Sequence, residues 1–174
     1  MDKLRGSSLP VVNELRDLDL EPMLLSGDDF PVVERVAASL GIKRAQGRMT
    51  PASKASALHA MRDADQVAAM VGDGINDAPA LATADVGLAV GTGTDVAIEA
   101  ADVVLMSGNL GAVPNAIALS KATIANIHQN LFWAFAYNTV LSPVAAGVLW
   151  PINGTLLAPT FAAGAMALSS VFVL

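Results

Sequence analysis

The chain has 174 residues, a net charge of −6 and no cysteine. The acidic balance and the lack of a basic patch argue against nonspecific nucleic-acid binding, and disulfides or thiolate metal ligands are excluded within the chain. Charge is unevenly distributed, because no Lys, Arg, Asp or Glu follows Lys121. The length suits one ordinary domain, or a domain with an appendage.

Hydrophobic spacing predicts helices that alternate with strands up to residue 106. Apolar residues recur at helical spacing in some segments and form short continuous runs in others, while Pro51 is placed to open a helix and Gly41 to end one. Helices are expected over 9–20, 31–40, 51–62, 77–83 and 94–100, and strands over 22–25, 44–49, 67–71, 86–90 and 103–106. This alternation predicts a parallel sheet with right-handed crossovers.

The last third of the chain has a different pattern. Residues 110–127 are expected to form a helix with one polar side. Residues 131–150 and 155–174 are each apolar for about the thickness of a bilayer and are joined by a short turn, which predicts a transmembrane hairpin. The alternative is a pair of buried core helices in a larger soluble protein. The predicted organisation is therefore a soluble part at 1–109, a connecting helix at 110–130, and two membrane helices at 131–174.

Residues 72–79 read Gly-Asp-Gly-Ile-Asn-Asp-Ala-Pro and directly follow the apolar strand expected at 67–71. The glycines allow a tight turn, and Asp77-Ala78-Pro79 is typical of a helix start. The carboxylates would then lie at the carboxyl end of a buried parallel strand, where open α/β sheets bind ligands. Oxygen ligands at that position suit Mg²⁺ together with a phosphate.

Three segments resemble the P-type ATPases, and among them the heavy-metal pumps of the copper-exporting type. They are Met70–Leu81, the run Gly-Thr-Gly-Thr-Asp-Val-Ala at 91–97, and the run Glu-Ala-Ala-Asp-Val at 99–103. The resemblance extends over residues 2–174. It implies an incomplete haloacid-dehalogenase-like (Rossmann-like) parallel sheet, followed by a long helix and the C-terminal hairpin.

The resemblance implies roles for residues of the central motif. Asp73, between Gly72 and Gly74, matches the Mg²⁺ ligand of the family. Asn76 and Asp77 match residues that support the metal and the phosphorylated loop. Without the resemblance, the same residues would form a capped turn between a strand and a helix.

Two other segments match the phosphate site of the family. Ser26-Gly27-Asp28 resembles its Thr-Gly-Asp, whose hydroxyl hydrogen-bonds the transferred phosphoryl group, and Lys54 matches the lysine that neutralises phosphate charge. Without the resemblance, Ser26-Gly27-Asp28 would be interpreted as a turn and Lys54 as a surface lysine. The family usually has an acidic residue before this lysine, and here that residue is Ser53.

Four residues of the last third resemble the transported-ion site of copper pumps. Tyr137 and Asn138 lie in the first expected span, and Met166 and Ser170 share one helical face of the second. A thioether favours Cu(I), and Ag(I) would use the same soft ligand. The aspartate expected in the last span of a zinc pump is absent. As an alternative to a role in an ion site, Met166 could fill a gap in the packing between helices. Tyr137 and Asn138 could likewise form polar contacts between helices.

The sequence also departs from the family. It contains no Asp-Lys-Thr-Gly-Thr and no Cys-Pro-Cys, and no nucleotide-binding domain is recognised. The strand that carries the phosphorylated aspartate in the family would lie between the strands that precede Ser26 and Gly72, so a gap with unpaired strand edges is expected there.

The chain is therefore interpreted as a C-terminal fragment of an ATP-driven Cu(I) export pump, inactive alone. Mg²⁺ and ATP are the cofactors expected in the complete pump, and its expected partners are the lipid bilayer and the missing N-terminal portion. The expected location is the plasma or inner membrane, with the soluble part in the cytoplasm. Two alternatives remain, a soluble phosphohydrolase of the haloacid-dehalogenase type and a non-enzymatic fragment that completes a separately encoded half.

Overall fold

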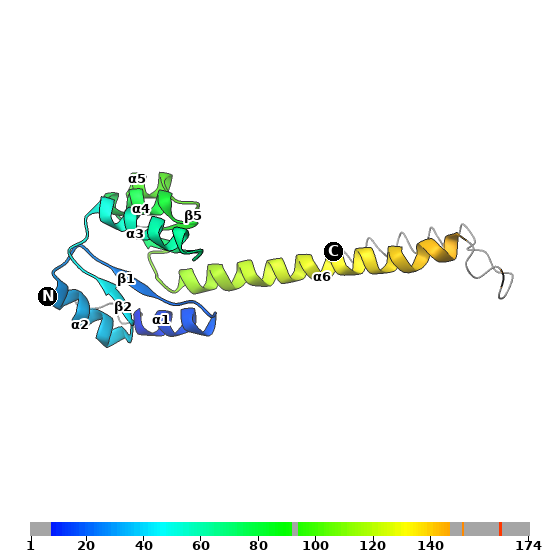
Figure 1. Ribbon diagram of the computed structural model, residues 1–174, viewed down its shortest axis with the longest axis horizontal. Coiled ribbons are helices and arrows are strands. Elements are labelled where there is room, and N and C mark those ends of the chain that lie inside the picture. The colour runs from blue at the N-terminus through cyan, green and yellow to red at the C-terminus, as the bar shows by residue number, and fades with distance from the viewer. Residues whose placement is uncertain (1–7, 92–93, 147–150, 152–163, 165–174) are drawn as a thin grey trace. The chain divides into compact units, whose positions relative to one another are not determined.

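A computed structural model describes residues 8–91, 94–146, 151 and 164 of the chain (Figure 1). The chain divides into two compact units, Met1–Ala118 and Leu119–Leu174. The first unit carries the strands and the shorter helices, and the second continues the last helix.

The elements of the first 106 residues alternate as the sequence predicts, with bounds that agree to within three residues. In chain order they are α1 (Ser8–Asp17), β1 (Met23–Leu25), α2 (Phe30–Leu40), β2 (Arg44–Gln46), α3 (Pro51–Asp63), β3 (Ala69–Gly72), the short 3-10 helix η1 (Ile75–Asp77), α4 (Ala78–Thr83), β4 (Val86–Val90), α5 (Asp95–Glu99) and β5 (Val103–Leu105), followed by α6 (Ala112–Ala145).

All strand pairs are parallel, as predicted, and they form two sheets. β1 pairs with β2, with Leu24 opposite Ala45. The second sheet has the order β3-β4-β5, with Met70 opposite Gly87 and Ala89 opposite Val104. Among the described residues no strand joins β1 to β3. This separation is the gap that the sequence predicts.

Two hydrophobic clusters hold the second sheet against its helices. One combines Leu58 of α3, Met70 of β3 and Leu81 of α4, and Leu81 is 1% exposed. The other packs Leu88 and Leu105 against Val113 in the first turn of α6. Burial of each such aliphatic side chain contributes about 1.5–3 kcal/mol. The clusters fix α3 and α4 beside β3, whose carboxyl end carries the central motif.

Local signals explain where the helices begin and end. α2 ends at Gly41, whose φ of +65° is accessible to glycine at little cost. α3 begins after Thr50, whose side chain accepts a hydrogen bond from the Ser53 amide while the Ser53 hydroxyl accepts one from the Thr50 amide. Such a reciprocal capping box stabilises the first helical turn. Lys54 follows directly, so the cap fixes where its side chain begins.

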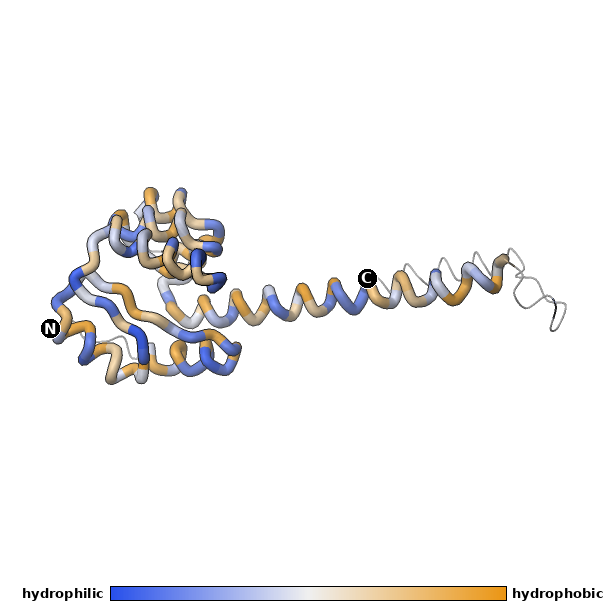
Figure 2. The backbone as a smooth tube through the Cα atoms, viewed as in Figure 1, coloured by the Kyte–Doolittle hydropathy of each residue, from blue (hydrophilic) through white to orange (hydrophobic). Residues whose placement is uncertain are grey.

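The C-terminal third differs from the prediction. Residues 112–145 form one continuous helix, whereas a helix at 110–127 and a separate span at 131–150 were expected. The helix continues because no glycine or proline interrupts residues 128–130. Of its two prolines, Pro114 lies in the first turn, where proline is tolerated, and Pro143 lies near the end. Hydrophilic residues recur among hydrophobic ones along its described length (Figure 2).

No helix in the described part of the chain is long and apolar enough to cross a membrane, so the predicted transmembrane hairpin is not supported. Polar residues recur along α6, among them Asn115, Asn126, Asn130 and Asn138, and lower its mean hydropathy. Apart from residue 164, the segment 155–174 lies outside the described residues.

Candidate functional site

The turn after β3 brings the central motif together. Gly72 ends the strand, and η1 and α4 follow within a few residues. A Cβ atom added at Gly72 would lie 2.6 Å from the Cβ of Asp77, a distance that real Cβ contacts do not reach. The glycine is therefore required for Asp77 to fold back against the end of β3.

Asp77 forms an ion pair with Lys54 of α3. The Lys54 Nζ lies 2.7 Å from the Asp77 Oδ1, and the two side chains are only 12% and 15% exposed. Screening by water is weak at such a site, so the pair is stronger than a surface ion pair. The structure thus brings together two residues that the sequence assigned to one site from positions 23 residues apart.

Asp73 is exposed and lies between the two glycines of the turn. Its backbone carbonyl accepts a hydrogen bond from the amide of Thr94, at 3.1 Å. The side chain of Thr94 caps α5 by accepting a hydrogen bond from the Ala97 amide. Thr94 therefore connects the β4–α5 loop to the backbone of Asp73.

Thr94 was not predicted as a site residue. The available signal was a threonine directly before Asp95 and a short apolar run, which is typical of an N-cap. The pairing of its amide with Asp73 could not be predicted, since that contact depends on the placement of β4 beside β3.

Ser26 directly follows β1 and belongs to a compact turn. Its Oγ accepts a hydrogen bond from the Asp28 amide and also lies 3.1 Å from the Asp28 carboxylate. Its backbone carbonyl accepts from the Met49 amide, and Gly27 lies against the Met49 carbonyl. The turn is thus attached to the residues that lead into α3.

The predicted phosphate-site residues are brought together only in part. Lys54 and Asp77 form an ion pair near the end of β3, Asp73 directly follows that strand, and Asn76 is exposed in η1. Among the described residues, no hydrogen bond or ion pair joins Ser26 or its turn to Lys54 or the β3 end. The connection between the two halves runs through the backbone from Met49 to Lys54.

The donor set at the β3 end fits Mg²⁺ with an incomplete ligand shell. In the described parts of the chain, no group of three His, Cys, Asp or Glu side chains could hold a metal ion. One exposed carboxylate, that of Asp73, is available, while one oxygen of Asp77 is paired with Lys54. Mg²⁺ is commonly bound by one or two carboxylates and completes its shell with water and phosphate oxygens.

The predicted transported-ion residues fall in the second unit. Tyr137 and Asn138 lie on α6, where the Asn138 Nδ2 donates to the Ala134 carbonyl of the same helix at 2.7 Å. Met166 and Ser170 lie outside the described residues. The grouping of these four residues stays a prediction.

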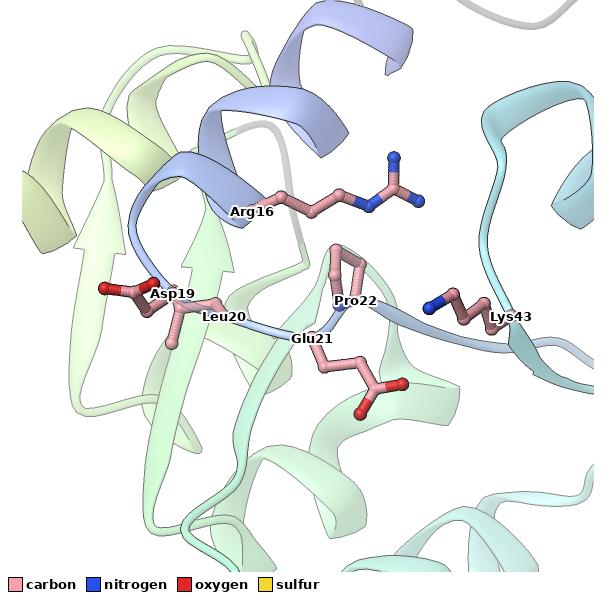
Figure 3. A pocket seen from close by; sticks show the side chains of 6 residues that line it. All are labelled: Arg16, Asp19, Leu20, Glu21, Pro22 and Lys43. Carbon is pink, nitrogen blue, oxygen red and sulfur yellow. The ribbon is translucent and has the colours of Figure 1, made fainter.

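A small pocket of about 280 Å³ lies at the opposite end of the β1–β2 sheet (Figure 3). Glu21 and Pro22 precede β1, and Lys43 precedes β2, so the pocket is at the amino ends of the strands. Arg16 extends beside it and donates to the Gly41 carbonyl at the end of α2. This arginine stabilises a helix terminus, away from the predicted phosphate site.

Comparisons with known proteins agree with this fold. The family model "Hydrolase: haloacid dehalogenase-like hydrolase" matches residues 1–85. A solved zinc-transporting PIB-type ATPase in its E2.Pi state aligns with a TM-score of 0.82 and 34% identity, covering 100% of this chain and 28% of that one. The parallel sheet with its helices is accordingly haloacid-dehalogenase-like.

Relatives that match nearly the whole chain are heavy-metal transporters. Copper-transporting ATPase 1 of Rhizobium meliloti (strain 1021) is 57% identical over 173 residues, which cover 99% of this chain and 21% of that protein. The silver exporting P-type ATPase of Salmonella typhimurium is 47% identical over 99% of this chain and 21% of that protein. The close homologues of the chain are thus copper- and silver-transporting P-type ATPases. The chain spans about a fifth of the length of each of these two relatives.

Proposed function

We propose that the chain supplies the Mg²⁺ and phosphate-binding residues of an ATP-driven heavy-metal export pump. The observation that carries the proposal is the largely buried Lys54–Asp77 ion pair beside the exposed Asp73, at the carboxyl end of a parallel strand. That edge of an α/β sheet is where ligands bind. Similarity to a copper-transporting ATPase over 99% of this chain, and 21% of that protein, supports phosphoryl transfer as the chemistry.

Each residue has a distinct role in the proposed site. Asp73 would hold Mg²⁺, and Lys54 would neutralise phosphate charge while Asp77 orients it. The Ser26 hydroxyl, positioned by Gly27 and Asp28, would donate to the transferred phosphoryl group. Phosphoryl transfer is catalysed mainly by such positioning and charge neutralisation, so these residues would contribute without forming a covalent bond themselves.

The proposed cargo is Cu(I), with Ag(I) as the related soft ion. Two relatives carry copper and silver in their names. Met166 would provide a thioether ligand, with Ser170, Tyr137 and Asn138 completing the ion path. The neighbouring solved structure is a zinc transporter, so the identity of the metal has to be measured.

The proposed pump contains more sequence than this chain. A partner portion would supply the phosphorylated aspartate and the ATP-binding domain, and the pump would lie in the plasma or inner membrane with residues of the first unit in the cytoplasm. The chain alone is therefore expected to form no phosphoenzyme and to transport nothing.

Labelled ATP with Mg²⁺ tests the proposal. The chain alone should take up no acid-stable, hydroxylamine-sensitive label. If the coding sequence upstream of Met1 contains an in-frame Asp-Lys-Thr-Gly-Thr, the extended protein should take up label that depends on Cu(I) or Ag(I). Asp73→Asn should abolish that label, whereas Asp95→Asn, at an exposed position on α5, should leave it. Label on the isolated chain would contradict the proposal.

A soluble phosphohydrolase is the second candidate, because the haloacid-dehalogenase-like match covers residues 1–85. This candidate predicts Mg²⁺-dependent hydrolysis of p-nitrophenyl phosphate by the chain alone, and recovery of the chain in the supernatant after an alkaline wash of membranes. The pump proposal predicts neither result. The remaining alternative is a non-enzymatic fragment that completes a separately encoded half, which would co-purify with that half after co-expression.

A further inference from the structure

The loop between β2 and α3 holds the turn of Ser26 through short backbone contacts. The Arg48 amide donates to the Asp28 carbonyl at 2.7 Å. The Met49 amide donates to the Ser26 carbonyl at 3.0 Å. The two backbones approach so closely that a Cβ atom added at Gly47 would lie 2.9 Å from the Asp28 carbonyl oxygen. The loop therefore packs directly against the turn.

Arg48 adds a side-chain contact to these backbone contacts. Its Nε donates to the Asp29 Oδ1 at 2.7 Å, and the two side chains are 74% and 66% exposed. The backbone of Arg48 is left-handed, with a φ of +54°, a conformation that is unfavourable for a residue with a Cβ and that occurs preferentially at functional sites. In this conformation the amide and the side chain of Arg48 contact two successive residues, Asp28 and Asp29.

Asp29 lacks a local contact that its position would allow. It is the N-cap residue of α2, where an aspartate side chain commonly accepts a hydrogen bond from the first helical turn, but its side chain makes no such bond. The carboxylate accepts from Arg48 instead. An ion pair this exposed adds little to the stability of a whole fold, so its effect is local to the loop and the turn.

The same loop leads into the helix that carries Lys54. Thr50 caps α3 with its side chain, and the Lys54 amide donates to the Thr50 carbonyl at 3.0 Å. In the described part of the chain no hydrogen bond or ion pair joins Ser26 to Lys54 directly. Their relative placement therefore depends on this loop and on what holds it to the turn.

We propose that Arg48 is a positioning residue for phosphoryl transfer. It holds Asp28 and Asp29 against the loop. This keeps the Ser26 hydroxyl where it can donate to the phosphoryl group whose charge Lys54 neutralises, and Arg48 itself does not contact that group. The inference rests on the proposed function of Ser26 and Lys54, whereas the contacts of Arg48 can be measured without it.

The first experiment measures these contacts in the full chain by hydrogen exchange. Arg48→Asn removes the guanidinium and introduces a residue that tolerates the left-handed conformation. The amides of residues 48 and 49 should exchange about fivefold faster, the upper end for loss of an exposed ion pair. Asp29→Asn should give the same increase. Arg35→Gln, which removes one positive charge at an exposed position of α2, should alter exchange at these amides by less than about twofold.

The second experiment measures the consequence for catalysis. This chain replaces the matching segment of copper-transporting ATPase 1 of Rhizobium meliloti, to which it is similar over 173 residues, and copper-dependent ATP hydrolysis by the chimera is followed. Arg48→Asn should lower the maximal rate by about fivefold and change the ATP concentration at half-maximal rate by less than about twofold, because only the alignment of the phosphoryl group is disturbed. Arg48→Lys keeps a cationic donor for Asp29 and should recover most of the rate.

A double substitution tests whether Arg48 acts through Ser26. In a Ser26→Ala background no hydroxyl is left to position, so Arg48→Asn should lower the remaining rate by less than about twofold. A full fivefold loss in this background would overturn the inference, because Arg48 would then act on the phosphoryl group or on the fold directly. Arg35→Gln should leave the rate unchanged in both backgrounds.

The outcomes separate this inference from the proposed function. A chimera without hydrolysis, or hydrolysis that survives Asp73→Asn, would contradict the proposed function and the inference with it. Hydrolysis that Asp73→Asn abolishes but Arg48→Asn leaves unchanged would overturn the inference alone. Unchanged exchange at residues 48 and 49 in both Arg48→Asn and Asp29→Asn would also overturn it, whatever the chimera does.

Discussion

Asp77 is the residue on which the geometry of the site depends, because it contacts Lys54 and also occupies the space that Gly72 leaves open. The motif at 72–79 contains Gly72 and Asp77, and the family resemblance implied the role of Lys54. Neither could predict that Lys54 would be paired with Asp77, because that contact depends on the packing of α3 against α4 and η1.

The Lys54–Asp77 pair should contribute measurably to stability. Lys54→Met keeps the aliphatic stem but leaves the carboxylate of Asp77, in a side chain 15% exposed, without its cation. The free energy of unfolding should fall by about 2–4 kcal/mol, measured by urea unfolding with far-UV circular dichroism. Arg48→Met is the control, since Arg48 and Asp29 form an exposed pair at 74% and 66% that contributes at most about 1 kcal/mol. Equal losses in the two variants would contradict this account of the pair.

Gly72 should not tolerate a side chain. Gly72→Ala places a Cβ 2.6 Å from the Cβ of Asp77, and the resulting overpacking should cost about 1–3 kcal/mol in the free energy of unfolding. Gly74→Ala is the matched control, because its Cβ would meet nothing nearer than 4.0 Å and its φ of −124° suits any residue. A similar cost at Gly74 would mean that the loss comes from the loop backbone and not from contact with Asp77.

At the scale of elements, sequence patterns predicted the order and type of every α-helix and strand up to β5, but not the short 3-10 helix η1. Caps and glycines gave clear signals there, as Gly41 and Thr50 illustrate. The continuous α6 was not predicted, because the helix over 110–127 and the span over 131–150 were expected as separate elements, although residues 128–130 are compatible with a helix. The connection from Thr94 to Asp73 was missed for a different reason, since it exists only once β4 and β3 are adjacent.

Asp85 connects α3 to the second sheet and should make stability depend on pH. Its carboxylate accepts from the Ala68 amide at 2.9 Å and from the Arg62 Nε at 3.2 Å. The amide hydrogen bond, with help from Arg62, holds the pKa of Asp85 below its usual value of 3.8. A lowered pKa means that the ionised carboxylate stabilises the folded state fully above pH about 4, and this contribution is lost as pH falls through the folded-state pKa.

Asp85→Asn tests this pH dependence, since asparagine keeps an acceptor for the Ala68 amide but carries no charge. The variant should be less stable than the unmodified chain at pH 7, and the difference should shrink as pH falls below about 4. Thermal unfolding across that range measures it. Glu34→Gln, at an exposed position on α2, is the control for loss of one negative charge. A difference that stays constant or grows at low pH would contradict the assigned sign.

At the scale of the whole molecule, the unequal distribution of charge predicted a division into 1–109, 110–130 and 131–174, which stays a prediction. The structure has two compact units, Met1–Ala118 and Leu119–Leu174. Sequence resemblance was needed to assign Ser26, Lys54 and Asp73 to one site, because they lie on three different segments. The Ser26 turn and the end of β3 are not joined, because they belong to two separate sheets. No local sequence pattern specifies how these two sheets are separated.

The first turns of α6 belong energetically to the first unit. Val113 is 3% exposed and packs with Leu88 and Leu105, and Ile117 packs against the same cluster.

A fragment of residues 1–118 keeps these contacts. In urea, its far-UV circular dichroism should therefore change at the same midpoint as that of the first unit in the full chain. A fragment of residues 1–111 loses these contacts and should be less stable by about 3–6 kcal/mol, twice the value of burying one aliphatic side chain. Both tryptophans, Trp133 and Trp150, follow residue 118, so circular dichroism has to be the probe. Equal stability of the two fragments would show that α6 contributes nothing to the first unit, contrary to the burial of Val113.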